Sequence, residues 1–223
     1  MIPWEVLDTA AVPGGHEPLR LKRRRGEFSI MLGSNELMNS RLSGSEEALA
    51  TLSSARLVGR PRPTILIGGL GMGFTLRAAL AAWGPDARLV VAELVPAVVT
   101  WARGPMAELF AGSLDDPRVE IREADVADLI AAGSGVYDAI LLDVDNGPDG
   151  LSRSANDRLY TAAGLVAARA ALKPAGVLAV WSAHPDRAYS ARLGRSGFRV
   201  EEVATRARGK RGARHLIWLA TRT

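Results

Sequence analysis

Glycines and acidic side chains gather at the ends of three successive apolar segments. The loop GLGMG (69–73) ends the first segment, Glu93 lies in the second (87–94), and Asp125 closes the third (116–125). Glycines let a backbone turn tightly and approach a ligand without Cβ clashes. An acid about twenty residues beyond such a loop can bridge ribose hydroxyls, and a further acid can accept from the exocyclic amine of adenine. A nucleoside-binding site is therefore predicted at Gly69, Gly71, Gly73, Glu93 and Asp125.

A fourth apolar run ends in the acidic stretch LLDVDNGPDG (141–150), which adds groups for a reaction. Asp143, at the end of the run, can orient an attacking amine and accept its proton. Asp145 points to the other side if the strand continues, because side chains alternate along a strand. Asp143, Asp145 and Asn146 are also hard oxygen ligands of the kind that magnesium prefers, but only Asp186 offers a further ligand nearby. We assign the chemistry to Asp143 and expect no metal.

Alternating strands and helices must position these groups. Runs rich in Val, Ile and Leu predict strands, and Ala- and Leu-rich segments that stop at Gly or Pro predict helices. The expected strands are 63–69, 87–94, 116–125, 136–144, 177–183, 199–206 and 215–222, and the expected helices are 74–84, 96–105, 126–133, 156–176 and 188–198. This order is typical of an α/β fold with a Rossmann-like, doubly wound, mostly parallel sheet. The last two strands predict an antiparallel edge.

The first sixty residues follow a different pattern. Within residues 20–40, the strand-like FSIML, a Gly-Ser-Asn turn and ELM predict a small β-hairpin unit. Residues 43–57 predict a helix with Ser45 as its cap, and Glu46 and Glu47 lie near its positive end. We interpret these two acids as helix-start residues rather than catalytic ones. The chain thus divides into an N-terminal hairpin and helix appendage, 1–60, and a ligand-binding domain, 61–223.

The spacing of the glycines separates two classes of nucleoside-binding protein. A dinucleotide fold uses G-x-G-x-x-G, which would place its third glycine where Phe74 stands. The G-x-G-x-G form of residues 69–73 fits proteins that bind S-adenosylmethionine (AdoMet) better. The segments ILIGGLGMGFTLR, VVAELVPAVVTWAR, DPRVEIREADV and YDAILLDVDNGP together resemble the AdoMet-binding domain of the spermidine synthase (aminopropyltransferase) family. The resemblance spans roughly residues 19–182.

Several expectations follow from this resemblance alone. It implies a seven-stranded sheet preceded by a small β unit, and a homodimer. It implies that the glycines of the 69–73 loop line the methionine part of the ligand, that Glu93 binds the ribose and that Asp125 binds the adenine amine. In the family an aspartate just after the fourth strand, matched here by Asp143, orients and deprotonates the attacking amine.

The part of the family pattern that holds the diamine is altered in this chain. Asn146 stands in place of the second aspartate of D-[ST]-[ST]-D-P, and Met38 stands in place of a glutamine after the hairpin. The Tyr-His-Glu run of the family is missing from GSEEALA (44–50). We therefore expect an AdoMet-dependent transferase that moves a methyl group to a small-molecule acceptor. Aminopropyl transfer from decarboxylated AdoMet is one alternative, and a nucleoside-binding protein without turnover is another.

Other side chains are candidates for contact with the acceptor. Arg41 can pair with a substrate carboxylate, and Tyr160, near the start of a helix that faces the Asp143 loop, can stack on a substrate. Asn146, in the loop after the fourth strand, and Trp181, near the end of the fifth strand, are further candidates.

Composition narrows the classes of function. The absence of cysteine excludes disulfides and thiolate nucleophiles. The net charge of +4 comes from arginines spread along the chain without interleaved aromatics, so we do not expect nucleic-acid binding. No apolar run approaches the ~20 residues that cross a bilayer, and the N-terminus has acidic residues where a signal peptide has basic ones. We expect a cytoplasmic protein with no membrane partner.

Overall fold

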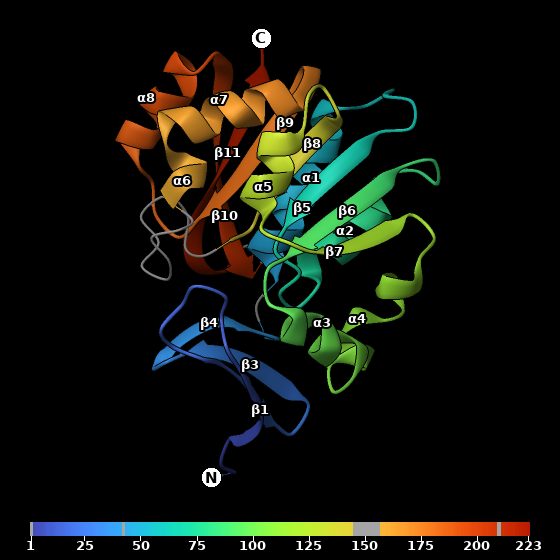
Figure 1. The fold of residues 1–223 in the computed structure, drawn as a ribbon, viewed down its shortest axis with the longest axis vertical. Helices are drawn as coiled ribbons and strands as arrows, with labels where there is room; N and C mark the ends of the chain where they lie inside the picture. The colour runs from blue at the N-terminus through green and yellow to red at the C-terminus, as the bar shows by residue number, and fades with distance from the viewer. Residues whose placement is uncertain (1, 42, 145–156, 209–210) are drawn as a thin grey trace.

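The computed structural model describes residues 2–41, 43–144, 157–208 and 211–223, which form two β-sheets (Figure 1). The strands of the larger sheet are β5 (Thr64–Gly68), β6 (Arg88–Glu93), β7 (Val119–Glu123), β8 (Tyr137–Leu142), β9 (Leu172–Ser182), β10 (Phe198–Arg208) and β11 (Arg211–Arg222). Their order is β10-β11-β9-β8-β5-β6-β7. The pairs among β5 to β9 are parallel, whereas β11 is antiparallel to both its neighbours. The predicted seven-stranded α/β fold with an antiparallel edge is confirmed.

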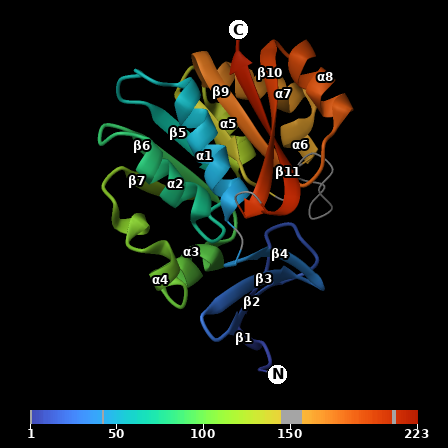
Figure 2. The same cartoon turned by 180° about the vertical axis from the view of Figure 1, so that it is seen from behind.

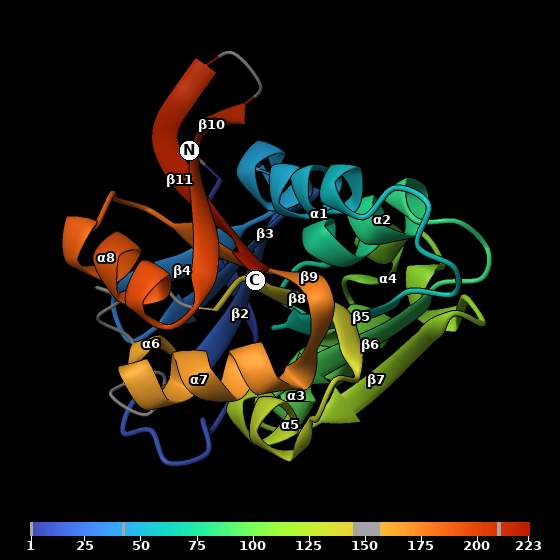
Figure 3. The ribbon, with the colours of Figure 1, turned by 90° about the horizontal axis from the view of Figure 1, so that it is seen from above.

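Helices cover both faces of the larger sheet. They are α1 (Gly44–Arg56), α2 (Phe74–Ala82), α3 (Pro96–Arg103), α4 (Ala107–Phe110), a 3₁₀ turn (Ser113–Asp115), α5 (Val126–Ala132), α6 (Asp157–Tyr160), α7 (Ala162–Ala171) and α8 (Arg187–Arg195). α1 and α2 lie on one face, and α5 and α7 lie on the other (Figures 2 and 3). Ile65 and Ile67 of β5 pack into the first core and Leu66 into the second. Because side chains alternate along a strand, burial on both faces explains the unbroken apolar runs.

The segment from residue 156 to residue 176 differs from the single helix that the sequence predicts. A new helix, α7, begins after Thr161, whose side chain accepts a hydrogen bond from the Gly164 amide (3.1 Å) and caps it. β9 then begins at Leu172, so α7 ends before residue 176, where we expected the helix to end. None of the helices in the described ranges is both long and apolar enough to cross a membrane.

The N-terminal unit is a four-stranded antiparallel sheet rather than a hairpin alone. Its strands, in spatial order, are β1 (Glu5–Ala10), β2 (Leu19–Arg24), β3 (Glu27–Leu32) and β4 (Asn35–Asn39). β3 and β4 form the expected hairpin, and β1 escapes prediction because its side chains are mostly exposed and show no apolar alternation. The sheet lies beyond the carboxyl ends of β5 to β8 (Figure 1). The indole nitrogen of Trp101 on α3 donates to Asp8 of β1 (2.6 Å) and ties the two units together.

The start of α1 also differs from the prediction. Ser43 occupies the N-cap position, and its side chain makes no capping hydrogen bond. Ser45, the expected cap, is buried within the first turn and donates its hydroxyl to Glu46 (2.7 Å). α1 packs along α2 and against β9 and β10. We therefore propose that α1 belongs with the larger unit and that the small unit consists of β1 to β4.

Candidate functional site

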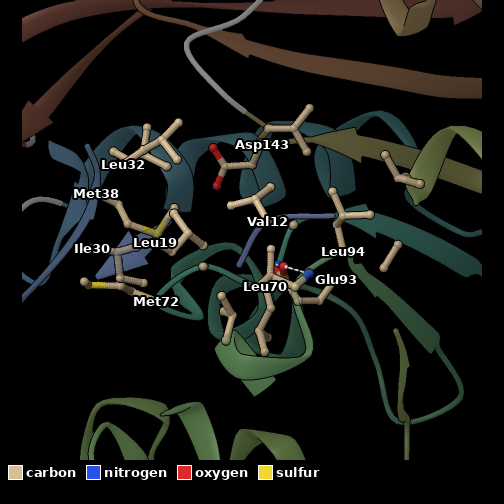
Figure 4. Close-up of a pocket in the computed structure, with 18 of the residues that line it drawn as sticks. Val12, Leu19, Ile30, Leu32, Met38, Leu70, Met72, Glu93, Leu94 and Asp143 are labelled. Carbon is tan, nitrogen blue, oxygen red and sulfur yellow. Dashed lines mark hydrogen bonds between the residues drawn. The ribbon is translucent and has the colours of Figure 1, made fainter. Parts of the chain in front are cut away.

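A pocket of about 400 Å³ lies between the carboxyl ends of β5 to β8 and the small sheet (Figure 4). Ligands of open α/β sheets bind at this edge, where the loops after the strands meet. The pocket brings together all the residues predicted for the cofactor and for chemistry, namely Gly69, Gly71, Gly73, Glu93, Asp125 and Asp143. The loop between β1 and β2 and the inner face of the small sheet close the opposite side.

Each glycine of the 69–73 loop has a left-handed backbone, with φ of 88°, 50° and 76° at Gly69, Gly71 and Gly73. A Cβ on Gly69 would come within 3.0 Å of the Asp143 carbonyl oxygen. A Cβ on Gly73 would come within 2.4 Å of the Phe110 ring, so this glycine also lets α4 pack against the loop. The loop therefore requires glycine for its conformation and for close packing with its neighbours.

The carboxylate of Glu93, at the end of β6, accepts hydrogen bonds from the glycine loop and from the turn after β6. One carboxylate oxygen accepts from the Leu70 amide (2.9 Å) and the other from the Val95 amide (2.8 Å). Burial raises the pKa of Glu93, while these backbone amides act in the opposite direction. The amides of Gly71 and Leu94 also act on the carboxylate and lower its pKa, and the side chain lines the pocket. A carboxylate at the pocket surface is able to accept a hydrogen bond from a ligand hydroxyl.

Asp125 follows β7 and caps α5 by accepting from the Ala127 amide (2.9 Å). Its second oxygen lies 2.8 Å from the guanidinium of Arg158, which also pairs with Asp128 (3.0 Å). Asp125 still lines the pocket. An amine of a bound base would share this carboxylate with Arg158, a partner that the sequence did not suggest because the two residues lie far apart in the chain.

Asp143 lies just beyond β8 at the centre of the pocket. One of its oxygens accepts a hydrogen bond from the Thr75 hydroxyl (2.8 Å), at the start of α2. Desolvation and the nearby negative charge of Glu46 raise the pKa of Asp143 to about 7, and the Thr75 hydrogen bond opposes this rise. A carboxyl group with a pKa near neutrality is able both to take and to return a proton at physiological pH.

Glu46 lines the pocket near Asp143, and the sequence analysis missed it as a functional residue. The Ser45 hydroxyl donates to Glu46 (2.7 Å) and lies 2.9 Å from His215 Nδ1 on β11. α1 packs along α2, and the Thr75 hydroxyl at the start of α2 lies 3.4 Å from the Glu46 carbonyl oxygen and 2.8 Å from Asp143. This contact brings the first turn of α1 to the carboxyl edge of the sheet. No local pattern in the sequence indicates it, and we interpreted Glu46 as a residue that stabilises the helix start.

Arg41 and Tyr160, two of the substrate candidates, do not line the pocket in the described part of the chain. Arg41 pairs with Glu36 (3.5 Å) and Glu27 (3.9 Å) of the small sheet. Tyr160 is buried, and its hydroxyl donates to the Val144 carbonyl (3.2 Å). Both side chains therefore have protein partners that hold them away from the cavity.

The remaining candidates divide between the described and undescribed parts of the chain. Asn146 lies outside the described residues. Trp181, at the end of β9, lines the pocket, and its ring meets that of His215 edge-on with 4.8 Å between centroids. Trp181 thus provides an aromatic wall on the side of the pocket next to Asp143.

The pocket wall carries a strong excess of negative charge. Its acidic side chains are Glu17, Glu46, Glu93, Asp125 and Asp143, and no lysine or arginine occurs among its described lining residues. His16 is the one basic side chain in that lining, while Arg158 reaches Asp125 from outside it. A concave wall of one sign concentrates ligands of the opposite sign. The pocket therefore suits a cation.

Comparison with curated proteins finds relatives of one kind. A polyamine aminopropyltransferase of Synechococcus is 31% identical over 122 residues, covering 55% of this chain and 38% of that protein. Polyamine aminopropyltransferase 1 of Streptomyces coelicolor is 34% identical over 127 residues, covering 56% of this chain and 23% of that protein. The chain thus spans well under half the length of these relatives. No protein-family model matches it.

Solved structures show the same fold. A spermidine synthase in complex with the transition-state analogue AdoDATO superposes with a TM-score of 0.76 at 20% identity, covering 98% of this chain and 72% of that chain. The chain therefore has a spermidine synthase-like fold. Human methyltransferase-like protein 13, in complex with SAH, superposes with a TM-score of 0.57 at 20% identity over 80% of this chain and 79% of that chain. The spermidine synthase-like fold therefore lies within a wider group that includes a methyltransferase-like protein.

The Glu46→Gln variant is expected to lower the pKa of Asp143 from about 7, because it removes the neighbouring negative charge that raises it. The carboxyl carbon of Asp143, followed by NMR as pH changes, should then titrate at a lower pH than in the unaltered protein. Glu47→Gln is the matched control, since Glu47 is the exposed neighbour outside the pocket lining. An unchanged midpoint in Glu46→Gln, or equal shifts in both variants, would show that the two carboxylates do not interact.

Proposed function

We propose that the protein binds decarboxylated AdoMet and transfers its aminopropyl group to an amine. The observation that carries this proposal is the charge of the pocket wall, which is acidic and lacks lysine and arginine among its described residues. Decarboxylated AdoMet carries two positive groups, a sulfonium and an ammonium, and no carboxylate. The carboxylate of AdoMet itself would face Asp143 and Glu46 with no lysine or arginine among the described lining residues to pair with it, at a cost that rises as water is excluded.

The glycine loop offers few free donors for a ligand carboxylate. The Gly69 amide donates to the Ala92 carbonyl (2.9 Å), and the Gly73 amide donates to the Leu70 carbonyl (2.9 Å). The Leu70 amide donates to Glu93. Since these amides already have partners within the protein, they add little to the binding of AdoMet over its decarboxylated form.

This proposal replaces the methyl transfer that we expected from the sequence. That expectation rested on Asn146 and Met38, which stand at positions of the diamine pattern and bear on the acceptor rather than on the donor. The curated relatives are named polyamine aminopropyltransferases, and the superposed spermidine synthase holds AdoDATO. Both comparisons favour aminopropyl transfer, which we had kept as the alternative.

The residues of the pocket fit the nucleoside part of such a donor. Glu93 lines the pocket and is able to accept from a ribose hydroxyl, while its backbone hydrogen bonds fix its orientation. Asp125, at the end of the neighbouring strand, is placed to accept from the adenine amine. The glycines of the loop add no side chains of their own to the space above it. The aminopropyl carbon that is bonded to the donor's sulfonium would then lie toward Asp143.

Asp143 is assigned the proton transfer. The bound donor supplies an electrophilic carbon next to its sulfonium. A new C–N bond forms between the acceptor amine and this carbon, while the C–S bond breaks and leaves its electron pair on sulfur as a neutral thioether, methylthioadenosine. The proton released by the amine passes to the Asp143 carboxylate, which the Thr75 hydroxyl holds in one orientation. The free amine, and not its ammonium form, is the nucleophile.

Isothermal titration calorimetry with AdoMet, S-adenosylhomocysteine, decarboxylated AdoMet and methylthioadenosine tests the donor. We expect decarboxylated AdoMet to bind at least tenfold more tightly than AdoMet, which corresponds to about 1.4 kcal/mol. Mass spectrometry should then detect methylthioadenosine and an aminopropylated amine. Tight S-adenosylhomocysteine binding with no response to decarboxylated AdoMet would restore methyl transfer. Binding of nucleosides without any product would indicate a protein that has lost turnover.

A further inference from the structure

We propose that the acceptor is an amine on an apolar chain with a single basic nitrogen, rather than a diamine. The inference rests on the proposed aminopropyl transfer and concerns the part of the same pocket that lies beyond Asp143. It is carried by a continuous apolar surface, the apolar wall, which consists of Leu19, Ile30, Leu32, Leu37, Met38 and Met72.

The apolar wall and the nucleoside end lie on opposite sides of Asp143. Figure 4 shows Leu19, Ile30, Leu32, Met38 and Met72 on one side and Glu93 with Leu94 on the other. Met38 approaches the glycine loop so closely that a Cβ on Gly71 would lie 2.9 Å from its sulfur. The wall therefore begins next to the place assigned to the reacting carbon, and an acceptor that presents its nitrogen to Asp143 must lay its chain against the wall.

The pairing of strands places four residues of the wall on one face of the small sheet, while Met72 joins them from the glycine loop. Leu19 of β2 lies opposite Leu32 of β3, and Ile30 of β3 lies opposite Met38 of β4. Side chains at alternate positions of a strand share one face, so these residues project together toward the pocket. Leu19 and Ile30 are buried, whereas Leu32 and Met38 are partly buried and keep surface available for a ligand.

Four of the five acids among the described lining residues already have a place in the proposed mechanism. Glu93 and Asp125 lie at the nucleoside end, and Asp143 with Glu46 faces the reacting nitrogen and the donor's ammonium. The remaining titratable groups among the described lining residues are His16 and Glu17, on the loop between β1 and β2.

Glu17 is exposed at the rim of the pocket. Its carboxylate lies over Gly33, where an added Cβ would meet it at 2.4 Å. The Glu17 carboxylate therefore lies at the turn between β3 and β4, at the exposed end of the apolar wall and not along it. A second ammonium on the acceptor chain would meet aliphatic and thioether groups along this wall.

The apolar wall should bind two acceptors of similar size with different free energies when one ends in an ammonium and the other in a methyl group. An ammonium moved from water to an apolar surface loses its hydration without a compensating partner. A methyl group in the same place is transferred favourably, because it leaves water. Trp181 adds an aromatic face beside Asp143 on which such a chain can also pack. The wall therefore selects for an apolar end and against a charged one.

Pentylamine and putrescine form a matched pair, because they have the same number of heavy atoms and differ in a terminal methyl or ammonium. With decarboxylated AdoMet as donor, we expect kcat/KM for pentylamine to exceed that for putrescine at least tenfold. An equal or higher value for putrescine would overturn the inference. Release of methylthioadenosine with either amine supports the proposed aminopropyl transfer whichever amine reacts faster. A failure of the acceptor inference can therefore be distinguished from a failure of the proposed function. If neither amine reacts, calorimetry on the methylthioadenosine complex compares their binding, and tighter binding of putrescine would again overturn the inference.

Met38→Glu is expected to reverse the preference by placing a carboxylate within the apolar wall. The matched control is Met31→Glu on the same sheet, since Met31 is absent from the described pocket lining and alternates with Ile30. The ratio of the two kcat/KM values should move by at least tenfold toward putrescine in Met38→Glu and stay unchanged in Met31→Glu. If Met38→Glu fails to fold, Leu32→Glu provides the same test. A ratio unmoved in a folded wall variant would contradict the proposal.

Discussion

Asp143→Asn is expected to lower kcat by about two to four orders of magnitude, the usual contribution of a general base. The amide keeps the size of the side chain and still accepts from the Thr75 hydroxyl, which lies 2.8 Å from the carboxylate, but it cannot take a proton. Affinity for decarboxylated AdoMet should change by less than about tenfold, or about 1.4 kcal/mol. Steady-state kinetics and calorimetry on the same variant separate these two quantities.

Asp115→Asn is the matched control for this experiment. Asp115 pairs with Arg103 on the surface, and its side chain is 79% exposed. Loss of such a pair has little effect on a folded protein, so turnover should be unchanged. Equal losses of affinity and turnover in Asp143→Asn would show that this carboxylate binds the donor or holds the fold and does not transfer the proton.

Gly73→Ala is expected to lower the free energy of unfolding by about 2–5 kcal/mol. A non-glycine residue at φ 76° costs about 1–2 kcal/mol. The added Cβ would also lie 2.4 Å from the Phe110 ring, and overpacking of this kind costs about 1–3 kcal/mol. Urea denaturation followed by circular dichroism measures the loss.

Gly84→Ala provides the comparison, because a Cβ there meets nothing within 4 Å and the backbone is not left-handed. We expect a change within about 0.5 kcal/mol for this variant. A double variant, Gly73→Ala with Phe110→Leu, should lose less than the sum of the two single variants, since the smaller side chain makes room for the methyl group. Strict additivity would show that the Phe110 contact is not the source of the loss.

The sequence predicted correctly those features that depend on a single strand, such as its burial and the residues at its end. The runs at β5 and β8 are buried on both faces and therefore read as unbroken apolar segments. Acids at the ends of neighbouring parallel strands must lie at one edge of the sheet, which is why Glu93, Asp125 and Asp143 could be placed together before the structure was known.

The features that the sequence did not reveal depend on contacts between distant segments. Glu46 reaches Asp143 because α1 packs along α2, and the charge pattern at the start of α1 looks like that of any helix start. Arg158 reaches Asp125 from the helix after β8. β1 has no apolar alternation, since it lies at the edge of its sheet and exposes most of its side chains. Local patterns carry no information about such pairings.

The pocket is shared between two sheets, and this arrangement would allow acceptor specificity to change while the donor site stays the same. The groups assigned to the donor lie on the larger sheet, whereas most of the apolar wall lies on β2, β3 and β4. Substitutions on the inner face of these strands would change which acceptor fits without altering the glycine loop or its acids. The small sheet is therefore the part of the molecule in which related chains could diverge in acceptor while sharing one donor and one chemical step.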